Sequence, residues 1–160
     1  MRRSRFLEDG ARYHVTVRVN NKEMLLEPEE AKQLFETVLI RAKRRYSFSL
    51  GHFVLMGNHI HLIILPHSDE SLSRIMQWIL SVFALKYNKM TGRTGHFWGD
   101  RFFSSVLGSL QQYLRTFDYI SQNPVKAGLT EHCSTWRYSG IYHLMRDWHF
   151  LVTDVSCFLD

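Results

Sequence analysis

The chain has 160 residues, of which 45% are hydrophobic and 22% are charged, so its composition is that of one globular domain and two domains would be cramped. Its formal net charge of +5 suits a polyanionic partner, although a solvated basic surface would carry the same charge. We expect no membrane-spanning helix and no secretion signal, because no apolar run approaches the roughly 20 residues of a span and no apolar stretch follows the basic N-terminus.

The basic residues are unevenly distributed along the chain. Residues 1–50 carry eleven Lys and Arg against seven acids, and residues 71–130 carry seven against two. The last thirty residues carry two against four. The positive excess therefore lies in the first and third stretches, where we expect contacts with a polyanion.

Cys133 and Cys157 are the only cysteines. Their spacing matches no zinc motif, and a single possible bridge is not a disulfide framework. We therefore expect a protein of the reducing cytoplasm.

The first two predicted elements are a strand and a helix. Apolar and polar residues alternate from Tyr13 to Asn20, which is typical of a strand with one buried face. Pro28 and the glutamates after it open a helix that runs to about Tyr46. The helix ends in cations that suit the negative end of its dipole, namely Arg41, Lys43, Arg44 and Arg45.

Two further strands are predicted at Gly51–Met56 and His59–Leu65, on either side of Gly57-Asn58. Gly57-Asn58 is a two-residue hairpin signal, although Asn-Gly is the commoner order. Ser71 then caps a second helix, whose apolar residues include Leu72, Ile75, Ile79 and Leu85.

The remaining elements follow a glycine-rich loop at Thr91–Gly99. We predict a short strand at Phe102–Leu107, a third helix at Leu110–Gln122 that Asn123-Pro124 closes, and a short helix in the tail from Trp136. The order β-α-β-β-α-(β) predicts an α+β fold in which an antiparallel-rich sheet has helices on one face.

His59 and His61 are the most specific local feature. Residues i and i+2 of a strand point to the same face, so the two imidazoles project together and could form half of a metal site. The same spacing also fits two histidines on a solvent-facing strand, and such pairs occur by chance.

The third predicted helix carries a tyrosine outside its apolar stripe. The expected stripe consists of Leu110, Tyr113, Leu114, Phe117 and Ile120. Tyr119 lies roughly opposite that stripe, and Asn123, four residues later, shares its face. An ordinary surface tyrosine would follow the same pattern.

Four segments together resemble the single-tyrosine HUH transposases, especially the REP-associated tyrosine transposases and their insertion-sequence relatives. They fall in the family's order and cover about residues 10–142 of a single domain that spans residues 1–160. The segments are Tyr13-His14-Val15-Thr16, Met56-Gly57-Asn58-His59-Ile60-His61-Leu62, Gly95-His96-Phe97-Trp98-Gly99-Asp100-Arg101-Phe102, and Tyr119-Ile120-Ser121-Gln122-Asn123-Pro124-Val125-Lys126-Ala127-Gly128-Leu129.

The resemblance implies a fold, a reaction and a set of residues. The fold is a ferredoxin-like (RRM-like) antiparallel sheet with helices on one face, plus a helix that carries the nucleophilic tyrosine, and it is commonly found in a homodimer. The expected location is the cytoplasm of a prokaryotic cell, at the nucleoid. His59 and His61 look like ligands of a divalent cation, Mg²⁺ or Mn²⁺, and Tyr119 looks like the nucleophile. Asn123 stands where relatives place a third, polar ligand, often glutamine, and a neutral carbonyl is a weaker Mg²⁺ ligand than a carboxylate. The implied activity is cleavage and rejoining of single-stranded DNA at hairpins or repeats through a 5′-phosphotyrosine link.

Contacts with DNA are predicted in two basic segments. Cations and aromatics alternate in Arg93, His96, Trp98 and Arg101, which suits phosphate contact and base stacking. The second segment is the cationic helix end, Arg41, Lys43, Arg44 and Arg45. Phe97, Trp98 and Phe102 are also candidates for the core, and the helix end could simply be solvated.

Two other functions remain open on the sequence alone. One is a domesticated protein that binds a DNA hairpin without cutting it, which would not need His59, His61 and Tyr119 together. The other is an RNA-binding module, because ferredoxin-like sheets also recognise RNA. Such modules place aromatics on central strands, where this chain has the histidine pair.

Overall fold

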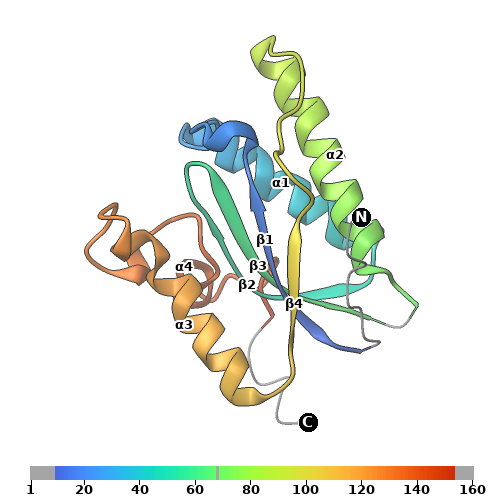
Figure 1. Ribbon diagram of the computed structural model, residues 1–160. Helices are drawn as coiled ribbons and strands as arrows, with labels where there is room; N and C mark the ends of the chain where they lie inside the picture. Colours follow the sequence, from blue (N-terminus) through green and yellow to red (C-terminus); the bar gives the residue numbers. More distant parts are fainter. Residues whose placement is uncertain (1–9, 68, 154–160) are drawn as a thin grey trace.

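The computed structural model describes residues 10–67 and 69–153, and it has the predicted α+β architecture (Figure 1). Four strands form one antiparallel sheet in the order β2-β3-β1-β4. Their bounds are Arg12–Arg18 for β1, Phe48–Leu55 for β2, His59–Pro66 for β3 and Phe103–Leu107 for β4.

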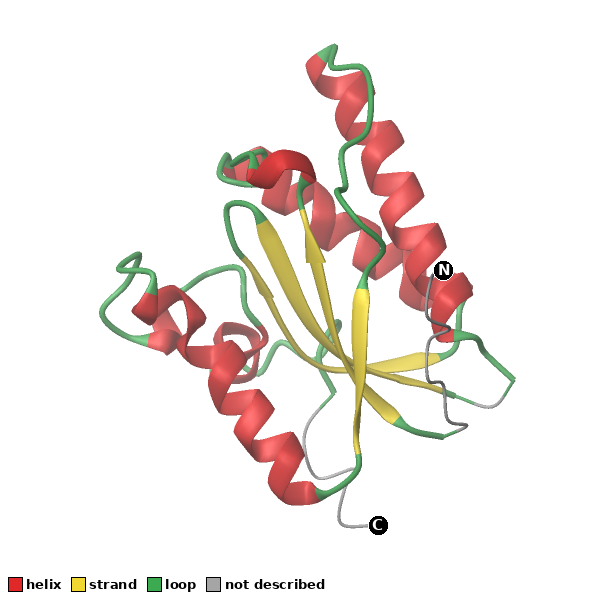
Figure 2. Ribbon diagram, in the orientation of Figure 1, coloured by secondary structure: helices red, strands yellow, loops and turns green. Residues whose placement is uncertain are grey.

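Helices lie on both sides of this sheet (Figures 1 and 2). Helices α1 (Glu29–Arg45) and α2 (Leu72–Thr91) pack together on one face. Helix α3 (Leu110–Lys126) crosses the opposite face. The short α4 (Gly140–Leu144) lies next to β2, and two 3-10 turns occupy Asn20–Lys22 and Cys133–Thr135.

The two faces of the sheet are chemically different because the strands alternate. On β1, Val15 and Val17 are buried against α1 and α2, whereas His14 and Thr16 face α3. The main core therefore lies under α1 and α2, where burial of apolar side chains contributes most of the stability. The face under α3 holds a small apolar cluster of Val54, Met56, Ile63, Tyr113 and Ile120.

Strand β2 begins three residues before its predicted start, at Phe48. A β-bulge between Leu50 and His52 interrupts the pairing with β3. The extra residue breaks the alternation of apolar and polar side chains, so the sequence pattern does not reveal that Leu50 and Phe53, three residues apart, belong to the same buried face.

Helix α3 continues through Pro124 to Lys126, so the predicted end at Gln122 is wrong. Pro124 costs one helical hydrogen bond, but it is buried on the same side of the helix as Ile120. Gly128 lies two residues beyond the helix end, and its φ of 72° allows Leu129 N–H to donate to the Pro124 carbonyl at 2.9 Å.

Two apolar stripes differ from prediction in part. Leu110 and Leu114 of α3 are 50% and 51% exposed, while Ser121 and Pro124 are buried. The residue after Tyr113 lies about 100° further round the helix, which takes Leu114 off the buried side. On α2, Leu85 is 73% exposed and Phe83 takes the expected core position.

No helix of the described residues combines the length and the apolarity needed to cross a membrane. Cys133 is a free thiol, and Cys157 lies outside the described residues.

Candidate active site

The pairing of β1 with β3 brings polar side chains together under α3. Thr16 is opposite His61 and Arg18 is opposite His59, so alternate residues of both strands share this face. His14 joins them, because its ring stacks on the His61 ring with centroids 5.1 Å apart. His59 and His61 thus point to the same face, as their spacing predicts, and they belong to a cluster of polar side chains from β1 and β3.

The tautomer of His59 follows from its neighbour in the hairpin turn. Asn58 Nδ2 donates to the Lys22 carbonyl at 3.2 Å, which directs the Asn58 Oδ1 acceptor to His59 Nδ1 at 2.8 Å. Nδ1 must then carry the proton. His59 Nε2 is left with a lone pair, and it faces Asn123 Oδ1 at 3.3 Å.

The second ring nitrogen of His61 is free in a similar way. His61 Nδ1 lies 3.0 Å from His14 Nε2 and 3.1 Å from Thr16 Oγ1, so Nε2 is the nitrogen that remains available. Burial, together with the nearby imidazoles of His14 and His59, lowers the pKa of His61 to about 3. His61 is therefore neutral near pH 7, as a metal ligand must be.

Helix α3 positions Tyr119 over this cluster. The Tyr119 ring meets the His61 ring edge-on at 5.5 Å between centroids and lies 6.2 Å from the His14 ring. Its side chain is 46% exposed, so solvent and a substrate can reach it. Lys126 Nζ lies 5.7 Å from the centre of the tyrosine ring, so a cationic side chain of the same helix borders the Tyr119 ring.

The donor set at this site fits a hard divalent cation. Among the described residues, no group of three or more His, Cys, Asp or Glu side chains could hold a metal ion. A cation here would be held by His59, His61 and the amide oxygen of Asn123, two neutral imidazoles and an oxygen, which suit Mn²⁺ or Mg²⁺. The lone pairs of His59 Nε2 and Asn123 Oδ1 face each other, and a cation bound between them would satisfy both acceptors. If the Asn123 amide were rotated by about 180°, its NH₂ group would instead donate to His59 Nε2.

We expect Asn58→Ala to weaken Mn²⁺ binding about 10- to 100-fold, because loss of a residue that orients a metal-binding histidine has that effect. Asn58→Asp retains the acceptor for His59 Nδ1 and should keep most of the affinity. Titration calorimetry with Mn²⁺ measures both variants. Equal affinities for Asn58→Ala and the natural chain would show that His59 does not depend on this hydrogen bond.

A buried histidine holds α3 against β2. His52 Nε2 lies 2.8 Å from Ser121 Oγ, and Ser121 Oγ donates to the Phe117 carbonyl at 2.8 Å. Ser121 must therefore accept the His52 Nε2 proton, and His52 Nδ1 is buried without a partner. Burial lowers the pKa of His52 to about 3, since a second proton on Nδ1 would find no acceptor.

Acid should therefore destabilise the fold through His52. Its pKa falls from 6.5 when exposed to about 3 in the fold, so the unfolded chain binds more protons between these values. The free energy of unfolding should fall as pH decreases across that window, by up to about 1.4 kcal/mol per pH unit from this one group. His52→Gln can still donate to Ser121 but does not titrate, so we expect a shallower fall in urea unfolding between pH 6 and 4. Parallel curves for the two proteins would contradict this account.

The residues predicted to contact DNA lie in two separate places. Arg93 donates to the His96 carbonyl at 3.0 Å and approaches Glu23 at 3.8 Å, while His96 and Arg101 are exposed. Trp98 packs against the core, and its indole N–H donates to the Leu80 carbonyl at 3.0 Å. Trp98 thus has a packing role in this structure, as do the buried Phe97 and Phe102.

The cationic end of α1 does not border the histidine cluster, because α1 and the cluster are on opposite faces of the sheet (Figure 1). Arg41, Arg44 and Arg45 are exposed. Lys43 differs, because its Nζ donates to the Leu151 carbonyl at 2.9 Å and burial lowers its pKa. Lys43 therefore holds the tail against α1, and the other three cations are free to meet a partner.

Sequence reasoning assigned no role to several residues that complete the site, namely His14, Thr16, Asn58 and Lys126. The alternation on β1 was a usable signal for His14 and Thr16, since it places them on one face. It could not show which face of β3 they would meet, because that depends on a register between residues 45 to 47 positions apart.

Known proteins resemble this chain in sequence and in fold. Residues 9–123 match the family model described as "Transposase IS200 like". A REP-associated tyrosine transposase of Escherichia coli (strain K12) is 28% identical over 163 residues, which cover 95% of this chain and 93% of that protein. A solved structure of a REP-associated tyrosine transposase bound to a REP hairpin has a TM-score of 0.76 at 25% identity, covering 93% of this chain and 88% of the other.

A putative transposase from Deinococcus radiodurans R1 shares the fold, with a TM-score of 0.54 at 15% identity over 76% of this chain and 97% of its own. The predicted resemblance and the ferredoxin-like fold class are therefore confirmed. The family model matches well over half of the residues, and the chain belongs to the IS200-like transposase family.

Proposed function

We propose that this protein is a metal-dependent, single-tyrosine HUH transposase that cleaves and rejoins single-stranded DNA at hairpin or repeat sequences. The observation that carries the proposal is the position of Tyr119, whose ring lies against His61 on a helix that also brings Asn123 to His59. A tyrosine packed only for stability would not need these polar neighbours.

The reaction needs a nucleophile, a charged electrophile and a leaving group. Tyr119 Oη attacks the phosphorus of a phosphodiester, the bond from phosphorus to the 3′ oxygen breaks, and the proton lost by the phenol is balanced by one gained at that oxygen. The products are a 5′-phosphotyrosine and a free 3′-hydroxyl. A second 3′-hydroxyl reverses the step with another strand, without ATP, because the phosphotyrosine retains the bond energy.

The residues of the site have distinct parts in this scheme. A bound divalent cation would polarise the phosphoryl oxygen and orient the scissile group. His59, His61 and Asn123 would hold it, and Lys126, whose Nζ lies 5.7 Å from the centre of the Tyr119 ring, would bring a positive charge near the scissile phosphate. His14 and Thr16 would orient His61 through its Nδ1.

The DNA substrate is inferred from the charge of the chain and from its relatives. A net charge of +5 favours a polyanion, and the structural relative with a TM-score of 0.76 is bound to a REP hairpin. We infer a similar hairpin substrate and action in the cytoplasm, at the nucleoid. Membership of a transposase family favours this over an RNA-binding module.

A cleavage assay tests the proposal. Single-stranded DNA labelled at either end and carrying an imperfect hairpin is incubated with protein and Mg²⁺ or Mn²⁺. We expect one cleaved product with a free 3′-hydroxyl, and the other end linked to protein. Hairpin binding without cleavage under either metal would favour the binding-only function.

The homodimer inferred from the resemblance remains a proposal. One chain of 160 residues has little surface with which to enclose a hairpin, so we expect a two-fold symmetric dimer. Light scattering at tens of micromolar, with and without DNA, measures the mass. A monomer under both conditions would contradict it.

A further inference from the structure

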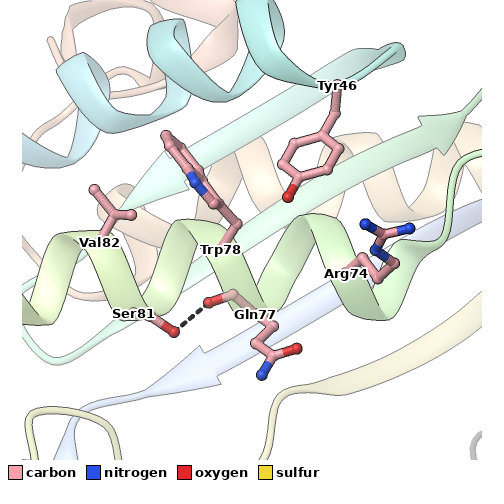
Figure 3. Close-up of a pocket in the computed structure, with 6 residues that line it drawn as sticks. All are labelled: Tyr46, Arg74, Gln77, Trp78, Ser81 and Val82. Atoms are coloured by element: carbon pink, nitrogen blue, oxygen red, sulfur yellow. Dashed lines mark hydrogen bonds between the residues drawn. The ribbon is translucent and has the colours of Figure 1, made fainter.

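A pocket of about 250 Å³ lies on α2 beside the start of β2, on the face of the sheet that α1 and α2 cover (Figure 3). The histidine cluster and Tyr119 are on the other face, so this pocket is separate from the candidate active site. Its lining combines aromatic, cationic and amide groups, and consists of Tyr46, Arg74, Gln77, Trp78, Ser81 and Val82.

The aromatic residues form one wall of the pocket. The Tyr46 and Trp78 rings meet edge-on with centroids 6.2 Å apart, and both remain partly exposed. Figure 3 shows Tyr46 directed towards α2, from which Trp78 and Arg74 project. Aromatic side chains at the rim of a pocket offer flat apolar surface to a planar ligand.

Cations surround this aromatic pair. The guanidinium of Arg41 lies 5.9 Å from the centre of the Trp78 ring, and that of Arg45 lies 5.8 Å from it. Arg74 contributes from α2. Within residues 10–67 and 69–153, none of these three arginines has an ion-pair partner. No carboxylate of the described residues therefore balances the charge of these arginines.

The same group of residues offers hydrogen bonds. Gln77 has an amide donor and an acceptor at the pocket, and Ser81 donates its proton to the Gln77 carbonyl, which leaves its oxygen as an acceptor. The nearby Glu70 carboxylate is bound to the Ser47 backbone N–H at 3.0 Å. Flat apolar surface, amide groups and unpaired guanidinium groups are what single-stranded nucleic acid requires.

We propose that this pocket binds one nucleotide of a DNA strand at a distance from the scissile phosphate. The base lies against Trp78 and Tyr46, and Arg41, Arg45 and Arg74 neutralise the adjacent phosphates. The volume is close to the lower limit of ligand pockets, about 300 Å³, which suits a single base. The inference rests on the proposed function only in that the partner is DNA, and it does not require cleavage.

The contribution of the pocket is measured as DNA affinity under conditions in which the protein cannot cleave DNA. In EDTA, the Tyr119→Phe protein is titrated with a fluorescent single-stranded oligonucleotide, alone and with Trp78→Ala or Arg74→Ala. Base stacking on an aromatic residue contributes about 5- to 150-fold in affinity, and we expect Trp78→Ala to lose an amount in this range. Lys89→Ala, an exposed position further along α2, removes one charge as Arg74→Ala does and serves as the control.

Photo-crosslinking identifies the contact directly. An oligonucleotide with 5-iodo-deoxyuridine is irradiated with the protein, and mass spectrometry maps the attachment. Attachment to Trp78 or Tyr46 supports the pocket even if the protein proves unable to cleave DNA. If cleavage proceeds but neither ring is labelled, and if Trp78→Ala and Arg74→Ala bind as Lys89→Ala does, the pocket proposal is wrong while the proposed function stands. Should Trp78→Ala fail to fold, Arg74→Ala and Gln77→Ala carry the affinity comparison.

Discussion

Tyr119→Phe should eliminate the covalent adduct between protein and DNA while leaving the fold and the DNA affinity close to those of the natural chain. The substitution removes only the attacking oxygen, and the ring that lies edge-on to His61 is retained. Because Tyr119 is 46% exposed, its hydroxyl has little part in core packing. The expected loss is therefore one of chemistry rather than of stability.

The structure narrows the choice of a nucleophile among the seven tyrosines of the chain. Tyr13, Tyr87 and Tyr113 are buried, and the ring of Tyr87 packs against Phe83 and Phe97. Tyr46 is on the opposite face of the sheet. Tyr138 donates to Glu29 at 2.7 Å, and burial together with this carboxylate raises its pKa to about 12.

Denaturing gel electrophoresis after incubation with labelled single-stranded DNA and Mg²⁺ or Mn²⁺ measures the adduct, and mass spectrometry of the digested adduct locates it. Tyr142→Phe is the matched control, since it removes an equivalent hydroxyl from a partly exposed tyrosine of α4, outside both the candidate site and the pocket on α2. A DNA remnant on any residue other than Tyr119 would refute the assignment.

His59→Ala and His61→Ala should each abolish cleavage yet leave hairpin binding largely intact. Phosphate neutralisation by Lys and Arg supplies much of the affinity of a protein for DNA, whereas the metal serves the chemical step. Loss of a residue that merely orients a ligand costs about 10- to 100-fold in activity or metal affinity, so loss of the ligand itself should cost more.

Two measurements separate these effects, namely cleavage in saturating Mn²⁺ and binding of the hairpin in EDTA. His132→Ala, on an exposed histidine of the tail, controls for removal of an imidazole. Calorimetry with Mn²⁺ adds a readout that does not depend on activity. Full cleavage by either variant would remove the assignment of these residues as ligands.

Local patterns predicted much of the fold, because each element carries its own signal. Alternation located β1 and β3, and the cap at Ser71 located the start of α2, where Ser71 Oγ accepts from Arg74 N–H. The bulge in β2 and the passage of α3 through Pro124 escaped prediction, because tertiary packing outweighs the local preference at both places.

Sequence reasoning named the principal residues of the candidate site and left out the neighbours that surround them. His59, His61 and Tyr119 are recognisable from spacing and from the family's segments, and the structure brings them together. His14 and Lys126 meet them only through strand register and helix position, which a single sequence does not specify. For the same reason, a single sequence does not specify on which face of the sheet the α1 cations lie.

The attachment of α3 has a consequence for how the site can be turned on and off. Tyr119 and Asn123 are one turn apart on a helix that the hydrogen bond from His52 to Ser121 ties to β2. Tyr119, the proposed nucleophile, and Asn123, the proposed oxygen ligand, therefore move together when α3 moves. Any displacement of α3 withdraws both from the histidines in a single motion, so the site is either assembled or dismantled. A partner that binds α3 and displaces it would thereby control when a strand is cleaved, without contacting a reacting atom.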